Sequence, residues 1–384
     1  MGKGKRTNVN KSTNVNKKIC FTAIFRNEGS NVYRCLDAAK PIIDYISITD
    51  TGSKDNTVEL IKKWGQENNI PTTVDIEEFK NFSYNRTKSY LNAKDNYPDT
   101  DYFLLLDADM VLVADDDFDK SSLTDNCYLV DQKNIHLIYP NVRLLDNKIK
   151  WKCVGATHEY WTDVKDDDSD ILIKKSKLQT MYIDDRNDGG HKQDKFVRDI
   201  RLLTDELNDP NISFDLKQRD SFYLAESYRN SGDPYNAQKW YRKRIKLGGF
   251  NEEIYMSYYN IGKCFHDMYK YEQAAGWYLK AWNYRPHRAE ALYNLVKMYR
   301  IQGNNFLAYQ LAKLGLKIKY PKDDILFVEY KIYTYEFDYE LSIVSYYVGD
   351  KNLGIASCKK ILSMSSSVSQ SVIETTKNNI KHYM

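Results

Sequence analysis

The feature of this 384-residue sequence that most constrains its fold is an internal repeat in the C-terminal half. Seven positions recur with a constant shift of 34 residues: Ile261, Gly262, Phe265, Ala274, Tyr278, Ala281 and Pro286 become Leu295, Val296, Tyr299, Ala308, Ala312, Gly315 and Tyr320. An earlier copy comprises Leu224, Ala225, Tyr228, Ala237 and Tyr241, and a fourth, less regular copy runs through Val344, Tyr347 and Ala356. Such a period predicts stacked helix pairs that bury their apolar faces only against their neighbours.

The repeated unit resembles the tetratricopeptide repeat, with a small residue where two helices cross and a closing proline at Pro286. We therefore predict an all-α, tetratricopeptide-like solenoid over residues 206–384. Its many tyrosines are expected to fill the helix crossings with their rings while their hydroxyls reach water. The face of such a solenoid is also a surface that a partner can use.

The overall composition favours ordinary folded domains and disfavours several classes of partner. A chain of 45.1 kDa is long enough for two hydrophobic cores. Its net charge of +3 disfavours binding to nucleic acid. No run of about 18 apolar residues occurs, so we expect no membrane span. Six scattered cysteines favour reduced thiols and a cytoplasmic protein, and residues 1–18 are predicted to be a disordered basic tail.

The N-terminal half alternates short apolar runs with segments of helical spacing. The runs that we interpret as strands cover residues 18–25, 45–50, 73–79 and 102–107. Helical spacing covers residues 31–39, 57–64 and 83–93. This alternation indicates βαβ units around a mainly parallel sheet. We therefore predict an α/β domain over residues 19–205.

Two aspartates, Asp107 and Asp109, end the apolar run FLLLDADM. Other D-x-D patterns in the chain lie in polar runs, where a solvated loop explains them. Ligands of open α/β sheets bind outside the carboxyl ends of the strands, so the location of this pair is informative. Two carboxylates at such an edge suit Mn²⁺ or Mg²⁺, with a diphosphate completing the coordination.

A second polar cluster, DTGSKDNT, begins at Asp50 where another predicted strand ends. A plain βα turn explains its Gly, Ser and Asn residues without any function. Asp50 is nevertheless placed to accept a hydrogen bond from a pyrimidine base. Asn27 and Glu28 follow the first strand and open onto the same edge.

Four segments in this order, FTAIFRNEG, DTGSKDNT, NFSYNRTKSYLNA and FLLLDADM, resemble a family 2 glycosyltransferase of the GT-A fold. The resemblance extends from residue 19 to about residue 200 and implies an inverting enzyme that uses nucleotide-diphosphate sugars. It implies that Asp50 and Arg86 contact the base, commonly uracil, and that Asp107 and Asp109 form the metal-binding D-x-D motif.

The segment WKCVGATHEYW resembles the acceptor-side loop that carries the catalytic carboxylate of this family. An inverting displacement needs a general base within hydrogen-bond reach of the acceptor. We expect Glu159 to be that base, and the alternative assigns the role of base or ligand to His158. The later segment DGGHK resembles the part that folds over the diphosphate. There His191 would be a third metal ligand, and Lys192 and Lys195 would counter phosphate charge.

The resemblance implies a metal-dependent hexosyltransferase that moves a sugar from a UDP-sugar to a peptide, protein or glycan acceptor. The repeat domain would position that acceptor or mediate a homodimer. The alternative is a non-catalytic interaction protein, in which the repeats bind a partner and the α/β domain is a nucleotide-sugar-binding remnant. A nucleotidyltransferase is disfavoured, because no glycine-rich basic signature accompanies the first strand.

Overall fold

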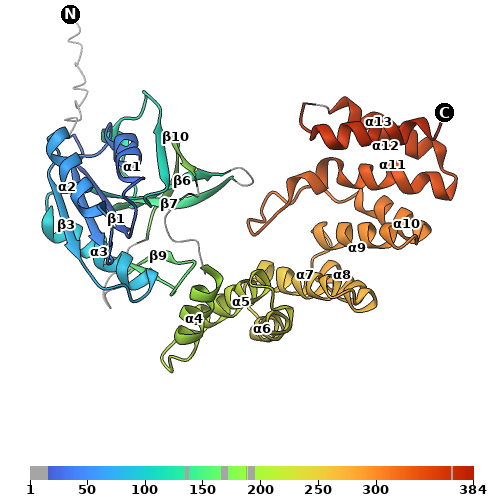
Figure 1. The fold of residues 1–384 in the computed structure, drawn as a ribbon, viewed down its shortest axis with the longest axis horizontal. Helices are drawn as coiled ribbons and strands as arrows, with labels where there is room; N and C mark the ends of the chain where they lie inside the picture. The colour runs from blue at the N-terminus through green and yellow to red at the C-terminus, as the bar shows by residue number, and fades with distance from the viewer. Residues whose placement is uncertain (1–15, 135–137, 166–171, 187, 189–194, 365) are drawn as a thin grey trace, which may run out of the picture. The chain divides into compact units, whose positions relative to one another are not determined.

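The structure is a computed structural model that describes residues 16–134, 138–165, 172–186, 188, 195–364 and 366–384. The chain divides into two compact units, residues 1–198 and 199–384 (Figure 1). The first unit is built around a β-sheet and the second is all helical, so the broad division predicted from the sequence is confirmed. The predicted boundary after residue 205 lies inside α4 (Lys195–Leu207). Most of the predicted disordered tail lies outside the described residues.

The first unit contains ten described strands and three α-helices ahead of α4. The strands are β1 (Ile19–Phe25), β2 (Tyr45–Asp50), β3 (Thr72–Ile76), β4 (Tyr102–Leu105), β5 (Met110–Ala114), β6 (Cys127–Lys133), β7 (Ile138–Asp146), β8 (Trp151–Val154), β9 (Tyr160–Asp163) and β10 (Lys175–Asp185). The helices are α1 (Val32–Ala39), α2 (Thr57–Asn68) and α3 (Phe82–Asn96), with a short 3₁₀ turn, η1 (Lys120–Ser122).

Eight of these strands form one mixed sheet in the order β3-β2-β1-β4-β7-β6-β10-β5. The first four strands in this order are parallel, as the alternating pattern predicts. From β4 onward the sheet is mixed, since β7 is antiparallel to both β4 and β6. Strands β8 and β9 form a separate antiparallel hairpin. The parallel half therefore carries the carboxyl edge at which the sequence places its polar residues.

Strand β1 shows how the two faces of the sheet are covered. Its side chains alternate between two apolar clusters, as the pleat of a strand requires. Phe21 packs in the cluster that contains residues of α1 and α2, whereas Cys20 packs with Tyr90 of α3. Both faces of the parallel half are therefore buried, which explains why its strands are apolar throughout.

The second unit consists of helices in sequential antiparallel pairs. Its helices after α4 are α5 (Phe214–Asn230), α6 (Pro234–Leu247), α7 (Asn251–Asp267), α8 (Tyr271–Tyr284), α9 (Glu290–Ile301), α10 (Asn305–Gly315), η2 (Ile332–Glu336), α11 (Phe337–Val348), α12 (Lys351–Ser363) and α13 (Gln370–Lys381). The 34-residue shift carries α7 and α8 onto α9 and α10, so the predicted tetratricopeptide-like repeats are confirmed.

At the repeat positions, a large side chain on one helix of a pair faces a small residue on the other helix. In the pair α7–α8, a Cβ on Gly262 would lie 2.6 Å from Cδ1 of Tyr278, so only glycine fits opposite that ring. In the next pair the same two positions are Val296 and Ala312, both fully buried. Because interiors are close-packed, the larger side chain on one helix requires the smaller on the other.

No helix in the described part of the chain combines the length and apolar character needed to cross a bilayer. All six cysteines fall within the described ranges, and each is a buried free thiol.

Candidate functional site

The carboxyl edge of the parallel strands brings together the polar residues that follow them. Asp50 is the last residue of β2, and Asp107 lies two residues beyond β4. Asn27 and Glu28 lie directly beyond β1, which pairs with both of those strands. The edge predicted from the sequence is therefore present.

Arg86 of α3 joins two of the predicted site residues. Its Nη2 lies 2.7 Å from Oδ1 of Asp107, and its Nε donates a 2.5 Å hydrogen bond to Oε1 of Glu159. The three side chains are only 16%, 27% and 17% exposed, respectively. Such charge-assisted pairs are the stronger kind of hydrogen bond. Arg86 thus bridges two carboxylates, and its predicted contact with a nucleobase stays a prediction.

The hairpin β8–β9 is fastened to α3, and this fastening places Glu159 beside Arg86. The backbone N–H of Phe82, at the start of α3, donates to the carbonyl oxygen of Ala156 at 3.2 Å. One turn later, the N–H of Cys153 donates to Oγ1 of Thr87 at 2.9 Å. The N-terminus of α3 is itself capped, because the Asn81 side chain accepts a hydrogen bond from the N–H of Tyr84.

The electrostatics of this cluster favour its charged state. Burial acts to lower the pKa of Arg86, but Asp107 and Glu159 outweigh it and hold that pKa above its usual range. Burial acts to raise the pKa of Asp107, and the charges of Arg86 and Arg143 outweigh it, so the pKa is lowered. Arg143 of β7 is itself buried, and its Nη1 donates to the carbonyl oxygen of Leu105 at 3.2 Å. Sequence reasoning missed Arg143, although a lone arginine within an apolar strand was a signal.

The predicted donor-binding residues Asp50, Asn27 and Glu28 hold the loops that follow β1 and β2. Oδ1 of Asp50 accepts hydrogen bonds from the N–H groups of Gly52 (3.0 Å) and Ser53 (2.9 Å), and its Oδ2 accepts from the Ser53 hydroxyl. The side-chain oxygen of Asn27 accepts from the N–H of Lys54 at 2.7 Å. Glu28 accepts from Nδ2 of Asn31 at 2.8 Å. These contacts give each residue a structural role in the loops beyond β1 and β2.

Three of the remaining predicted residues lie within the described residues. His158 is exposed in the β8–β9 turn with a positive φ of 53°, and Lys195 is exposed at the first position of α4. Asp109 is partly buried, and its carbonyl oxygen accepts from the N–H of Arg186. His191 and Lys192 lie outside the described residues.

The predicted metal ligands are Asp107, Asp109 and His191, of which the two aspartates lie within the described residues. Among the described residues, no group of three or more His, Cys, Asp or Glu side chains is arranged to hold a metal ion. Asp107 already has Arg86 as its counter-ion. A bound Mn²⁺ or Mg²⁺ would have to displace this counter-ion, and the metal site stays a prediction.

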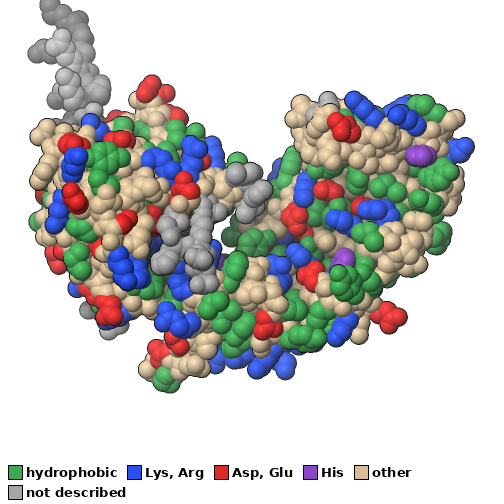
Figure 2. Space-filling model, viewed as in Figure 1, with side chains coloured by type: hydrophobic (Ala, Val, Ile, Leu, Met, Phe, Trp, Pro, Cys, Tyr) green, Lys and Arg blue, Asp and Glu red, His purple; other side chains and the backbone are tan. Residues whose placement is uncertain are grey.

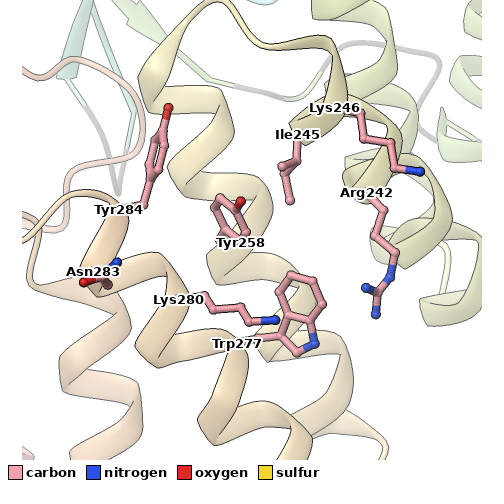
Figure 3. Close-up of a pocket in the computed structure, with 8 residues that line it drawn as sticks. All are labelled: Arg242, Ile245, Lys246, Tyr258, Trp277, Lys280, Asn283 and Tyr284. Carbon is pink, nitrogen blue, oxygen red and sulfur yellow. The ribbon is translucent and has the colours of Figure 1, made fainter.

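A second candidate site is a groove of about 570 Å³ across α6, α7 and α8 (Figure 3). The residues that line it are Arg242, Ile245, Lys246, Tyr258, Trp277, Lys280, Asn283 and Tyr284. Its aromatic residues form a row, with Tyr258 in the middle: its ring centroid is 6.0 Å from that of Trp277 and 5.6 Å from that of Tyr284. We call this feature the α6–α8 groove.

Two cations lie against the indole ring of this groove. The Arg242 guanidinium of α6 and the Lys280 ammonium of α8 each lie 4.4 Å from the centroid of Trp277. Lys246 adds a third positive charge, and none of the eight lining residues is acidic. Cations over an aromatic face are attracted by the ring quadrupole, which holds them in place without neutralising their charge.

The positive surface continues along α6 beyond the groove. An adjoining hollow of about 450 Å³ shares Arg242 and Lys246 with the groove and adds Lys239 and Lys243. Burial, together with the charges of Lys217 and Lys239, lowers the pKa of Lys243. Lys and Arg side chains gather along the lower edge of the view in Figure 2, where Figure 1 places α5 and α6. Sequence reasoning missed this groove, although Arg242 and Trp277 lie about one repeat apart.

Comparisons with known proteins found similarity to solved structures. No family model and no curated protein matches the chain. Among solved structures it is similar to MamA, with 19% identity and a TM-score of 0.36 over 45% of this chain and 91% of that one. A tetratricopeptide repeat protein from Parabacteroides merdae shares 15% identity with a TM-score of 0.38, over 50% and 68% of the chains. A thermophilic repeat protein from Thermus thermophilus shares 14% identity with a TM-score of 0.34, over 49% and 92%.

These findings correct two predictions. The prediction of a family 2 glycosyltransferase is wrong, and so is the prediction of a hexosyltransferase enzyme, because the similar solved structures are tetratricopeptide repeat proteins. The described contacts give the motif residues Asp50 and Arg86 structural roles. Asp50 closes a turn, and Arg86 pairs with Asp107 and with Glu159.

Proposed function

We propose that this chain is a binding protein whose helical domain takes up an acidic segment of a partner protein in the α6–α8 groove. One observation carries the proposal: Arg242 and Lys280 flank Trp277 in a groove with no acidic lining residue. Positive charge that the protein does not neutralise is available to a carboxylate, which Arg binds in a bidentate fashion. A partner with acidic and aromatic or aliphatic side chains would use both the cations and the row of rings.

The same geometry favours a protein partner over single-stranded nucleic acid. Bases bind such proteins chiefly by stacking on an aromatic face. Trp277 already has Arg242 and Lys280 over its ring, so its face is occupied. The carboxylates of a peptide can instead meet these cations at their outer sides. The earlier alternative of an interaction protein thus gains a defined surface, while a homodimer and a cytoplasmic location stay predictions.

Binding can be tested with a defined probe. We suggest a fluorescein-labelled peptide of alternating Asp and Glu around a central Phe, titrated with the full chain and followed by fluorescence anisotropy. Arg242→Glu should weaken binding at least about tenfold, because it reverses charge where the peptide carboxylates would lie. Trp277→Ala should weaken it by a similar factor, since it removes the ring that holds Arg242 and Lys280 in place.

Two controls separate the groove from general charge. Lys377→Glu makes the same kind of reversal at an exposed position of α13 and should leave the affinity within about twofold. A peptide with Asn and Gln in place of Asp and Glu should bind weakly to every variant. Equal weakening by Arg242→Glu and Lys377→Glu, or no binding of the acidic peptide to the wild type, would overturn the proposal.

We propose as a second function that the N-terminal domain has a GT-A-type arrangement that binds a nucleotide-diphosphate sugar without transferring it. The support is the polar edge of the parallel strands β1, β2 and β4, where ligands of open α/β sheets bind. In the described arrangement Asp107 is paired with Arg86, so a dication would need that pair to open. Donor and Mn²⁺ or Mg²⁺ should therefore bind together or not at all.

Calorimetry with UDP-glucose as the probe tests this second proposal. Heat of binding should appear only when Mn²⁺ is added with the nucleotide sugar, and Asp107→Asn should abolish it. Absence of binding with and without Mn²⁺ would remove the N-terminal domain from the functional account. The peptide titrations of the helical domain would be unaffected by that result.

A further inference from the structure

The segment between α10 and η2 folds back along the helical domain instead of connecting the two directly. Residues 324–327 of this segment contact α5, α7 and the residues just before α9. The segment therefore lies along helices that precede it by one to three repeats. We call residues 321–328 the strap.

Asp324 of the strap is held by two arginines, Arg285 and Arg288. Nη2 of Arg285 donates a 2.6 Å hydrogen bond to Oδ1 of Asp324, and Nη1 of Arg288 lies 3.2 Å from Oδ2. These hydrogen bonds and charges outweigh the effect of burial and lower the pKa of Asp324. Its neighbour Asp323 is exposed. Of these two adjacent aspartates, the arginines bind Asp324.

The backbone of the strap is held on both sides. Oε2 of Glu252 accepts hydrogen bonds from the N–H groups of Ile325 (2.9 Å) and Leu326 (2.7 Å). Nη2 of Arg288 donates to the carbonyl oxygens of Leu326 (3.1 Å) and Phe327 (3.3 Å). A carboxylate that accepts from successive N–H groups and an arginine that donates to the following carbonyls can bind any chain of this conformation.

Leu326 and Phe327 of the strap contact the helices, whereas Ile325 is largely exposed. Leu326 packs against the apolar cluster of α5 to α9, and the Phe327 ring stacks with Phe222 of α5 at 6.5 Å between centroids. Ile325 is 81% exposed. The surface under the strap therefore recognises aspartate at the first position, accepts any residue at the second and recognises leucine at the third.

The residues that hold the strap are fixed by other bonds as well. Arg288 is fully buried, its Nε donates to Oε2 of Glu290 at 3.0 Å, and its guanidinium lies 4.8 Å from the centroid of Tyr255. Glu252 is 6% exposed within α7. Arg288 therefore keeps Glu290 and Tyr255 as partners when the strap leaves, as a binding site for a separate peptide requires.

We propose that Glu252, Arg285 and Arg288 form a binding site for a peptide segment with the pattern Asp-x-Leu, which residues 324–326 occupy within the same chain. A partner carrying this pattern must displace the strap, so the strap limits access to the site. The site shares no lining residue with the α6–α8 groove and stands whether or not that groove binds a partner.

The probe is a labelled synthetic peptide with the sequence of residues 321–328, PKDDILFV, added to the full chain. Asp324→Asn weakens the strap in its own site while Arg288 keeps Glu290 as a partner. This variant should bind the peptide at least about tenfold more tightly than the wild type. Asp323→Asn is the matched control and should behave as the wild type. A peptide with Asn in place of its second Asp should lose the gain.

Hydrogen exchange of the wild-type chain provides a second measurement that needs no variant. Excess peptide should speed exchange at the amides of Ile325 and Leu326, because displacement exposes them to water. Unchanged exchange at these amides would overturn the proposal. So would a folded Asp324→Asn variant that binds the two peptides equally or binds neither.

Discussion

The carboxyl edge of the sheet contains largely buried cations and the α6–α8 groove contains exposed ones, and the two regions balance charge in opposite ways. At the edge, Arg86 is paired with Asp107 and with Glu159. In the groove, Arg242 and Lys280 are paired with the ring of Trp277 and with no carboxylate among the described residues. A cation neutralised by its own chain stabilises the fold, whereas one held by a ring keeps its charge for a ligand. The two regions should therefore respond differently to the loss of a cation.

The largest effect is expected from Arg86→Leu, which leaves two carboxylates without their shared counter-ion. We expect the free energy of unfolding to fall by about 3 kcal/mol, measured by urea denaturation. Arg86→Lys should recover only part of this loss, because an ammonium cannot bridge both carboxylates with the fixed geometry of a guanidinium. A loss below about 1 kcal/mol for Arg86→Leu would show that the edge does not depend on this pair.

The groove depends on the close approach of α7 and α8, which Gly262 permits. Gly262→Val should cost about 2 kcal/mol of unfolding free energy, because its side chain would collide with Tyr278. Adding Tyr278→Ala reproduces the pair Val296 and Ala312 of the next repeat and should recover part of the loss. Double-mutant urea titrations check this coupling, and strictly additive losses would contradict the volume exchange.

Asp220 of α5 is a buried carboxyl group. Burial first, and then the neighbouring Glu206, raise the pKa of Asp220 to about 9. Between about pH 4 and pH 9 the folded chain holds a proton that the unfolded chain releases, so this group lowers stability as the pH rises.

Asp220→Asn removes this titration from the folded protein. We expect the variant to gain about 1 to 2 kcal/mol over the wild type by pH 9 and to show little difference near pH 4. Urea denaturation at pH 4, 7 and 9 measures the trend. An advantage that does not grow with pH would show that Asp220 is ionised in the folded chain.

The smallest effect on stability is expected in the groove itself. Arg242→Ala should change the unfolding free energy by no more than about 0.5 kcal/mol, since it breaks no ion pair and leaves no buried group unpaired. Measurement of Arg242→Ala and Arg86→Leu in the same buffer compares the groove directly with the carboxyl edge. Similar losses for both variants would end the distinction between the two regions.

Much of the architecture could be predicted from the sequence because its determinants are local. Residues such as Ala274 and Ala281 mark helix crossings within one repeat, and the apolar runs of β1 and β4 mark buried strands. Strand ends also placed Asp50 and Asp107 at one edge.

The partners of these residues could not be read from the order of the chain. Glu159 reaches Arg86 only because the β8–β9 hairpin is fastened to α3. The strap likewise returns to helices far earlier in the sequence, where Asp324 meets Arg288. The sequence motifs identified the charged groups. The three-dimensional contacts show which carboxylates are already paired with a cation of the same chain.

The most direct test of the account is an NMR titration of the indole N–H signals with the acidic Phe-containing peptide. The chain has six tryptophans, so Trp277→Phe identifies the signal of the groove. The account predicts that this signal shifts progressively as peptide is added and that the indole signals of the N-terminal domain stay in place. Shifts confined to the other tryptophans, or none at Trp277 at saturating peptide, would contradict it.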